Sequence, residues 1–283
     1  MKTVINNPES FARDYREKGY AIVRQVFDSS DIALLSSAFD ELKAYASQFD
    51  STYRDKNQLY VYQWGEAANR NKLLRFVKWP SYRFPIFERF RTDPRLLEII
   101  KPLLGENIKQ ITNQAAWKEP GDPRTSYGYH QDAYWRTPRE AFRNLESSYL
   151  QTFIAVDPHT VENGCLSVIE GSHKKLECYR PKGNVLTSPF SSDDLSEYGL
   201  ESFKQVNVLL EPGDVVIWGP YMFHGSDANR STWDRRVYIN GYVKAEDCDR
   251  GEYAFRDGRP VALGEPQLVD YDDLYTNPEP HYL

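Results

Sequence analysis

Two histidines and one aspartate have the side-chain types that hold a catalytic metal ion. His130 and Asp132 lie two residues apart in the stretch YGYHQDAYWR, which spans residues 127–136. Residues i and i+2 of a β-strand point to the same face, so both side chains can reach one ion while Gln131 points away. An H-x-D pair on its own occurs often by chance, and an ordinary structural pair is then the commoner interpretation.

The chain has five histidines, so a third histidine ligand would be one of the four besides His130. His224 follows the apolar stretch GDVVIWGPYMF, and a buried histidine near the end of a core strand needs a hydrogen-bond partner or a metal. Two histidines and one carboxylate leave three positions open on iron(II), unlike a closed structural zinc site. We expect His159 to be solvated in a turn, His173 to lie at a loop edge and His281 to be mobile near the chain end.

An arginine follows this histidine in the sequence. Arg235 opens the stretch RRVYINGYV, and a guanidinium that is always charged can bind a carboxylate through two hydrogen bonds. Neighbours on a strand point to opposite faces, so we predict that Arg235 points inward and Arg236 points to solvent. A pair of solvated charges is the alternative interpretation.

Helices and one strand are predicted before residue 106. Apolar residues recur at helical spacing, with Asp28 or Ser29 as the N-cap of the second helix and Gly105 ending the third. Residues 50–80 are polar and aromatic without a clear period, so we expect a long excursion such as a lid. The predicted helices cover 8–19, 28–49 and 93–105, and the predicted strand covers 20–27.

Short apolar runs separated by turn residues predict a β-rich core after these helices. Turn signals such as PGD and ENG separate the runs, and six or more short strands at this spacing predict a sandwich or jelly roll. The predicted strands are 108–117, 148–157, 165–171, 203–210, 213–219 and 235–243, with a long polar loop at 172–202.

These elements predict one mainly β domain with flanking α-helices over residues 1–283. It comprises a helical section at about 1–105, a jelly-roll core at about 106–245 and an irregular tail at about 246–283. We find no internal repeat and no linker that would divide the chain into two domains.

Composition narrows the class of protein. The formal net charge of −6 disfavours nucleic acid or an anionic membrane as a partner. No apolar stretch is long enough to span a bilayer, and no signal peptide is expected at the start. The three cysteines (Cys165, Cys178 and Cys248) have no tight spacing, which fits a reducing cytoplasm.

Several motifs in order resemble the phytanoyl-CoA dioxygenase family. They are HQD at 130–132, ENGCLSVIEGSHK at 162–174, EPGDVVIW at 211–218 and HGSDANRSTWDRR at 224–236. The stretches KGYAIVRQVFDSSDIALL and TDPRLLEIIKPLLG also look like the family's N-terminal section, so the resemblance runs from about residue 8 to about 245. One departure is Glu170, which replaces the usual proline of PGSHK.

The resemblance implies a double-stranded β-helix, a cupin-like jelly roll, with helices packed outside. It implies that iron(II) is held by His130, Asp132 and His224, with 2-oxoglutarate and O2 as cosubstrates. Arg235 and Ser226 then bind the distal carboxylate of 2-oxoglutarate. The residues matched to the flanks of the cosubstrate are Gln114, Lys118 and Phe153.

The activity implied is hydroxylation of an unactivated C–H bond, with 2-oxoglutarate converted to succinate and carbon dioxide. We expect a small or medium organic substrate, such as a natural-product intermediate, and a monomer or homodimer. Halogenating relatives have a small residue at the carboxylate position, so Asp132 disfavours halogenation. Acyl-CoA hydroxylation stays open, as do desaturation, epimerisation and cyclisation. A catalytically silent cupin-like sensor is expected to lack one of the metal ligands or the arginine, and here all are present.

The substrate-binding side chains are sought next to the metal ligands. Alternation puts Tyr134 on the ligand face if the strand continues and puts Tyr129 on the other face. Packing in the core or at the rim is the alternative role for these aromatic rings. The candidates are Tyr127, Tyr129, Tyr134, Trp135 and Lys78, and the arginines that could meet an anionic group are Arg124, Arg136 and Arg139.

Overall fold

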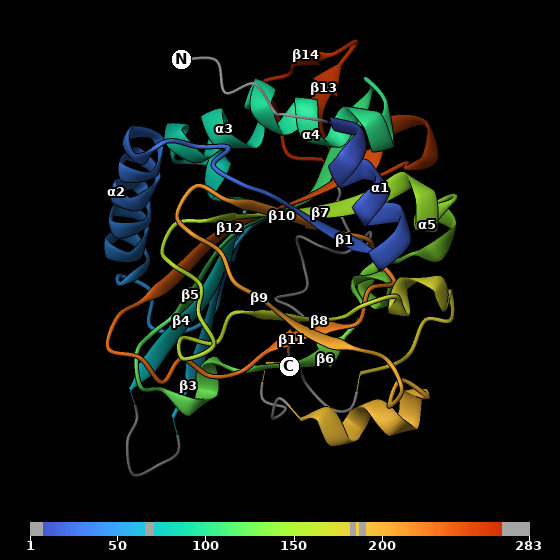
Figure 1. The fold of residues 1–283 in the computed structure, drawn as a ribbon. Coiled ribbons are helices and arrows are strands. Elements are labelled where there is room, and N and C mark those ends of the chain that lie inside the picture. The colour runs from blue at the N-terminus through green and yellow to red at the C-terminus, as the bar shows by residue number, and fades with distance from the viewer. Residues whose placement is uncertain (1–7, 66–70, 182–184, 187–190, 268–283) are drawn as a thin grey trace.

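The computed structural model describes residues 8–65, 71–181, 185–186 and 191–267. Helices α1 to α4 pack against one side of a large sheet (Figure 1). None of the described helices is both long and apolar enough to cross a membrane. The α-helices are α1 (Pro8–Lys18), α2 (Ser29–Ala46), α3 (Pro85–Arg91), α4 (Pro94–Leu104) and α5 (Leu145–Ser148).

Two antiparallel sheets form a jelly roll, which confirms the predicted fold. The large sheet has ten strands in the order β1-β10-β7-β12-β5-β4-β3-β2, with β13 and β14 attached through β5, and the small sheet has the order β6-β11-β8-β9. The strands are β1 (Tyr20–Val23), β2 (Tyr53–Asp55), β3 (Gln58–Trp64), β4 (Lys72–Lys78), β5 (Ile108–Lys118), β6 (Tyr127–His130), β7 (Tyr149–Ala155), β8 (Leu166–Ile169), β9 (Gln205–Val208), β10 (Val215–Trp218), β11 (His224–Ser226), β12 (Arg235–Lys244), β13 (Glu252–Arg256) and β14 (Arg259–Pro260).

Helix α2 shows why the helices cover the outer face of the large sheet. Its N-cap is Asp28, as predicted, and the side chain accepts hydrogen bonds from the backbone amides of Ser30 and Asp31. Its apolar residues recur every three or four positions, so they form one stripe that faces the sheet. The buried members of the stripe are Ile32, Leu35, Ala38, Phe39, Leu42 and Ala46.

The inner face of the large sheet presents side chains in rows that cross paired strands. Every second residue of β12 faces inward, while residues between them, such as Tyr238, pack beneath the helices. Gly241 belongs to an inward row, and a Cβ there would lie 2.4 Å from the Tyr149 hydroxyl, so only glycine leaves room for that ring. The rows run Arg235–Lys118, Val237–Ala116–Ala155, Ile239–Gln114–Phe153 and Gly241–Thr112–Gln151.

Residues 50–80 are not an excursion, contrary to the prediction. They contain β2, β3 and β4, and β4 pairs with β5 through Phe76, Val77 and Lys78. Most of β4 is buried on both faces, so its apolar residues do not alternate with polar ones. The stretch before residue 106 is therefore part of the sheet and not only helical.

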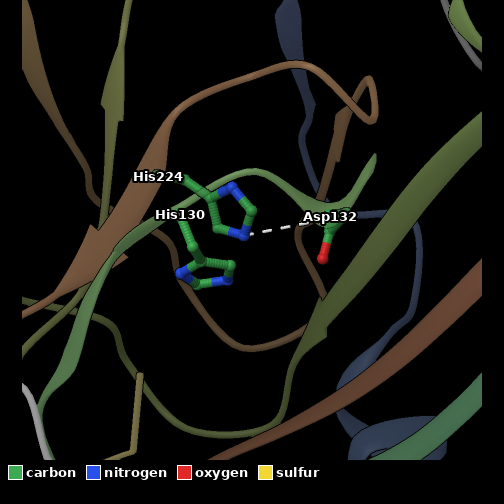
Figure 2. A group of neighbouring side chains, drawn as sticks. All are labelled: His130, Asp132 and His224. Carbon is green, nitrogen blue, oxygen red and sulfur yellow. Dashed lines mark ion pairs between the residues drawn. The ribbon is translucent and has the colours of Figure 1, made fainter. Parts of the chain in front are cut away.

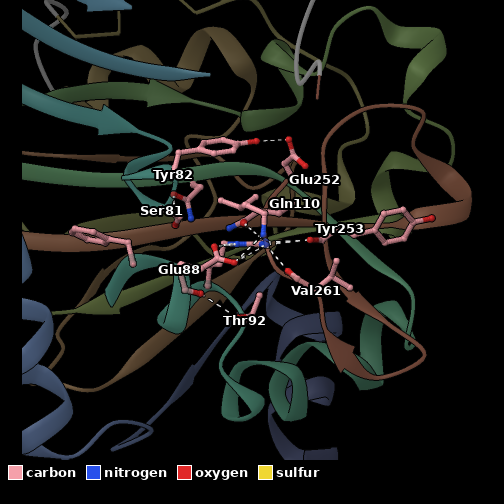
Figure 3. A network of polar contacts seen from close by, with 12 residues as sticks. Ser81, Tyr82, Glu88, Thr92, Gln110, Glu252, Tyr253 and Val261 are labelled. Carbon is pink, nitrogen blue, oxygen red and sulfur yellow. Dashed lines mark hydrogen bonds and ion pairs between the residues drawn. The ribbon is translucent and has the colours of Figure 1, made fainter. Parts of the chain in front are cut away.

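The tail is also more ordered than predicted, up to residue 267. Its strand β13 pairs with β5 and with β14. The guanidinium of Arg91 holds this segment, because it is fully buried and donates to the carbonyl oxygens of Tyr253 and Val261. Figure 3 shows these partners converging with Glu88 and Gln110, which accept the other hydrogen bonds of Arg91.

Replacing Arg91 tests this anchor. Arg91→Leu removes the charged donor from the Glu88 carboxylate and from two part-buried carbonyl groups, so we expect the free energy of unfolding to drop by about 3 kcal/mol. Urea unfolding measures the loss. Arg89→Leu is the matched control, because Arg89 forms a half-exposed ion pair with Asp31 and should cost at most about 1 kcal/mol. Equal losses in the two variants would contradict the anchor.

Candidate metal centre and cosubstrate pocket

The three predicted metal ligands come together between the sheets (Figure 2). His130 ends β6 and His224 begins β11, and the two are direct partners in the antiparallel pairing. Asp132 starts a 3-10 turn immediately after β6. One ligand atom from each of the three residues lies within 4.8 Å of the others, and the His224 Nε2 and Asp132 Oδ2 atoms are 3.7 Å apart.

Backbone hydrogen bonds set the tautomer of both histidines. The Nδ1 atom of His130 donates to the carbonyl of Gly128 at 2.7 Å, and that of His224 donates to the carbonyl of Met222 at 2.9 Å. The proton of each ring is therefore on Nδ1, which leaves the lone pair of Nε2 for a metal. Both accepting carbonyls lie two residues before their histidine, so the backbone that leads into each histidine orients its ring.

The protonation of the centre also suits a cation. Burial and the neighbouring His224 lower the pKa of His130 to about 3, so the ring is neutral at physiological pH. Burial on its own would raise the pKa of Asp132, but His224, His130 and Arg136 hold that pKa below its ordinary value. The indole of Trp218 donates to Asp132 Oδ2 at 2.9 Å and orients the carboxylate. The neutral imidazole of His130, the Nε2 atom of His224 and one carboxylate are a donor set that fits iron(II).

Arg235 lies in the cavity that contains the metal centre. It points inward, as predicted, with its guanidinium 5.7 Å from the centre of the Phe153 ring and Nη1 donating to the Gly164 carbonyl at 2.7 Å. Burial lowers the pKa of Arg235 to about 10, which still leaves the side chain charged at neutral pH. Gln114, Phe153 and Ser226 line the same cavity.

Lys118 takes a different place from the one predicted. It is fully buried, and its ammonium group donates to Ser226 Oγ at 2.6 Å and to the carbonyl of Asp227. It is absent from the described lining of the cavity and lies behind Ser226. Burial, with Arg235 and Arg75 nearby, lowers the pKa of Lys118 well below its usual range.

Arg236 points to the opposite face, as predicted, but not into solvent. Its guanidinium forms ion pairs with Asp157 at 2.8 Å and with Asp40 at 3.1 Å. Only 16% of the side chain is exposed, because α2 covers this face of the sheet and supplies Asp40. The residue therefore joins a strand to a helix.

The candidate substrate residues divide into two groups. Tyr127, Trp135 and Lys78 line the cavity, and the Trp135 ring lies 5.1 Å from that of His130. Tyr129 and Tyr134, the other two candidates, are not among the described lining residues. Tyr129 alternates to the other face of β6 and packs in a separate cluster, and the strand ends at His130, so Tyr134 does not continue the ligand face.

Some residues at the centre escaped prediction. Trp218 bonds to a residue that is 86 positions away, and no local signal in the sequence marks that contact. His159 is buried and not solvated as expected, because its ring packs edge-on against Phe153 at 5.1 Å. Of the three arginines near the motif, only Arg136 lines the described cavity, whereas Arg124 pairs with Asp122 and Arg139 with the Ala133 carbonyl.

A jelly roll with two histidines and a carboxylate around one cavity is the architecture of facial-triad oxygenases. The chain belongs to the phytanoyl-CoA dioxygenase family, whose sequence model matches residues 15–237. Membership confirms the resemblance noted in the sequence and the enzyme class predicted from it, a dioxygenase that depends on iron(II) and 2-oxoglutarate.

Individual relatives agree with this family. A dioxygenase from Epichloe uncinata is 30% identical over 147 residues, which is 52% of this chain and half the length of that protein. A probable alpha-ketoglutarate-dependent hypophosphite dioxygenase from Stutzerimonas stutzeri is 25% identical over 83% of this chain and 78% of its own. The crystal structure of EctD from S. alaskensis with 2-oxoglutarate and 5-hydroxyectoine shares the fold, with a TM-score of 0.67, 21% identity and coverage of 92% of this chain and 88% of that chain.

The lowered pKa of His130 gives the metal-free protein a defined dependence on pH. The ordinary pKa is 6.5 and the folded value is about 3, so unfolding below pH 6.5 takes up a proton at this residue. Stability therefore falls as the pH drops from 6.5 towards 3. His130→Gln removes this contribution, and we expect a shallower slope of unfolding free energy against pH in that window. Urea unfolding of both proteins with chelator measures the slopes, and equal slopes would contradict a buried neutral His130.

Proposed function

We propose that His130, Asp132 and His224 hold iron(II) in an active dioxygenase that hydroxylates a small or medium organic molecule. The observation that carries the proposal is the meeting of the two histidine Nε2 atoms and one oriented carboxylate in a cavity that also contains a buried arginine. Iron(II), 2-oxoglutarate and O2 together supply the oxidising power for replacing a C–H hydrogen with a hydroxyl group. The protein's own part is to hold the metal, orient the cosubstrate and the substrate, and exclude water from the cavity.

The end of the cavity at Arg235 fits the distal carboxylate of 2-oxoglutarate. Arg235 is charged and buried, and a buried charge needs an opposite one. Ser226 lines the same end, and Lys118 donates to its hydroxyl oxygen, so the hydroxyl hydrogen is left to point elsewhere, including into the cavity. The buried hydroxyl of Tyr127 has no hydrogen-bond partner among the described residues, and we assign it to the same carboxylate.

The remaining lining residues serve the cosubstrate or the substrate. Gln114 and Phe153 lie in one row of the inner face and flank the path between Arg235 and the metal centre. Trp135 lies against His130, where it contacts a substrate bound next to the metal. A small substrate is supported by the relative named for hypophosphite. Whether the reaction ends in hydroxylation, desaturation or ring closure depends on the substrate. A natural-product intermediate is the substrate class that we favour.

Metal binding tests the ligand assignment. Under nitrogen, iron(II) should raise the melting temperature of the wild type, by an amount equivalent to about 2.7 kcal/mol at a hundredfold excess over Kd. Asp132→Ala and His224→Ala lose a ligand, so we expect no metal-induced shift and no succinate formation coupled to product.

His173→Gln is the control, because His173 lies outside the described cavity and should keep the shift. A full metal-induced shift in Asp132→Ala would exclude that residue as a ligand. Wild-type protein with iron(II) and 2-oxoglutarate but no O2 should also show a weak visible charge-transfer band. Absence of this band would favour the alternative that the protein is a catalytically silent sensor.

The cosubstrate end is tested through 2-oxoglutarate affinity. Arg235→Gln removes the charge, so we expect the KM for 2-oxoglutarate to rise at least about tenfold, and Tyr127→Phe removes one neutral donor and should raise it roughly threefold to tenfold. Succinate release against 2-oxoglutarate concentration measures both. Tyr134→Phe is the control, because Tyr134 is not among the described lining residues, and this variant should leave the KM unchanged. An unchanged KM in Arg235→Gln would refute the assignment.

A further inference from the structure

His159 is a buried histidine that the proposed function does not use. It lies in the connection between β7 and β8, and the residue is only 1% exposed. Its ring packs edge-on against Phe153, and the same phenyl ring has the guanidinium of Arg235 5.7 Å from its centre. The imidazole therefore lies at the Arg235 end of the cavity, against a residue that lines it.

The one hydrogen bond of the His159 ring sets its tautomer. Its Nε2 atom lies 3.4 Å from the backbone carbonyl oxygen of Arg236, which can only accept, so Nε2 carries the proton. Burial and the charge of Arg235 lower the pKa of His159 well below its usual value, so the ring is neutral at physiological pH. The lone pair is then on Nδ1, which is buried and has no hydrogen-bond partner among the described residues. The ring thus has one unused acceptor.

Arg235 has the complementary unused donor. Its Nη1 atom donates to the carbonyl of Gly164 at 2.7 Å, which engages one of the two hydrogens on that nitrogen. Its Nε atom is buried and has no partner within the part of the chain that the structure describes. A buried donor or acceptor without a partner is unfavourable, and a single hydrogen bond between Arg235 Nε and His159 Nδ1 satisfies both groups.

We propose that His159 is a positioning residue, which accepts a hydrogen bond from Arg235 Nε in the enzyme that has 2-oxoglutarate bound. This inference rests on the proposed function, in which Arg235 binds the distal carboxylate, and adds the residue that orients the arginine. Gly164 and His159 then hold the guanidinium at Nη1 and Nε, and hydrogens of Nη1 and Nη2 remain for the two carboxylate oxygens.

A neutral partner suits this place better than a charged one. A carboxylate next to Arg235 would compensate the charge of the guanidinium and weaken its attraction for the cosubstrate. A protonated imidazole would repel the guanidinium and would offer no acceptor. The neutral ring of His159 orients Arg235 and leaves its charge available for 2-oxoglutarate.

Substitutions that each keep a different part of the His159 ring test the proposal. The Oδ1 atom of asparagine takes the place of Nδ1, the amide of glutamine reaches the place of Nε2, and leucine replaces neither nitrogen. The visible band of the protein with iron(II), without O2, reports the Kd for 2-oxoglutarate. We expect the Kd to rise about threefold to tenfold in His159→Leu and His159→Gln, and to stay within about twofold of the wild-type value in His159→Asn.

A cosubstrate analogue separates positioning of Arg235 from general damage to the pocket. 2-Oxopentanoate has the same 2-oxo acid group but no distal carboxylate, so its affinity should be equal in the wild type and His159→Leu. His173→Leu is the matched control, because His173 also has its Nε2 atom against a backbone carbonyl, that of Arg16, but is absent from the described lining. This control should leave the Kd for 2-oxoglutarate unchanged.

A double-mutant cycle ties the effect to Arg235. In the Arg235→Gln background, His159→Leu should weaken 2-oxoglutarate binding no further, because the group that His159 orients is gone. If His159→Leu does not fold, His159→Gln carries the same prediction, since it also removes the acceptor at the place of Nδ1.

The outcomes that overturn the proposal differ from those that overturn the proposed function. A wild-type Kd in His159→Leu, an equal loss in His159→Asn, an equal loss for both 2-oxo acids or additive losses in the cycle would each refute the role of His159 alone. An Arg235→Gln variant that binds 2-oxoglutarate as tightly as the wild type would refute the cosubstrate assignment and this inference together. A wild type that forms no visible band would also refute both.

Discussion

The antiparallel pairing of β6 with β11 is the constraint on which the rest of the centre depends. It makes His130 and His224 direct partners, and the carbonyl two residues before each histidine orients its ring. A shift of one residue in register would turn Tyr129 inward and His130 outward. Strand β8 pairs with the other edge of β11, through His224 and Val168, so β11 is held from both sides. The relative positions of the two histidines are therefore fixed by the register of the small sheet, although β6 and β11 are short.

Burial decides the chemistry of the side chains that this register brings together. His130 is kept neutral, so that its Nε2 atom can bind a cation, while Arg235 stays charged in a place where water is scarce. Lys118 remains behind Ser226 and acts on the cavity through that hydroxyl. The cavity thus encloses the side chains of His130, Asp132 and His224 together with one buried guanidinium.

Residue types together with the family resemblance predicted that His130, Asp132, His224 and Arg235 meet around one cavity, and spacing predicted most strands of the core. Turn residues on either side identified β7, β10 and β12 as short apolar strands, and rare histidines stood out against the background. Strand β4 was not predicted because it is buried on both faces and its residues do not alternate. Tyr134 was placed on the ligand face because nothing in the sequence shows that the strand ends at His130. Contacts such as Trp218 with Asp132 join distant segments, and only the folded chain reveals them.

The alternation of inner and outer rows has an evolutionary consequence. Thr112, Gln114 and Ile239 face the cavity, whereas their neighbours on the same strands, such as Tyr238, pack beneath the helices. Mutations at every second position can therefore reshape the pocket while the cluster beneath the helices stays unchanged. A duplicated gene with this fold can acquire a new substrate in small steps, without passing through an unstable intermediate protein.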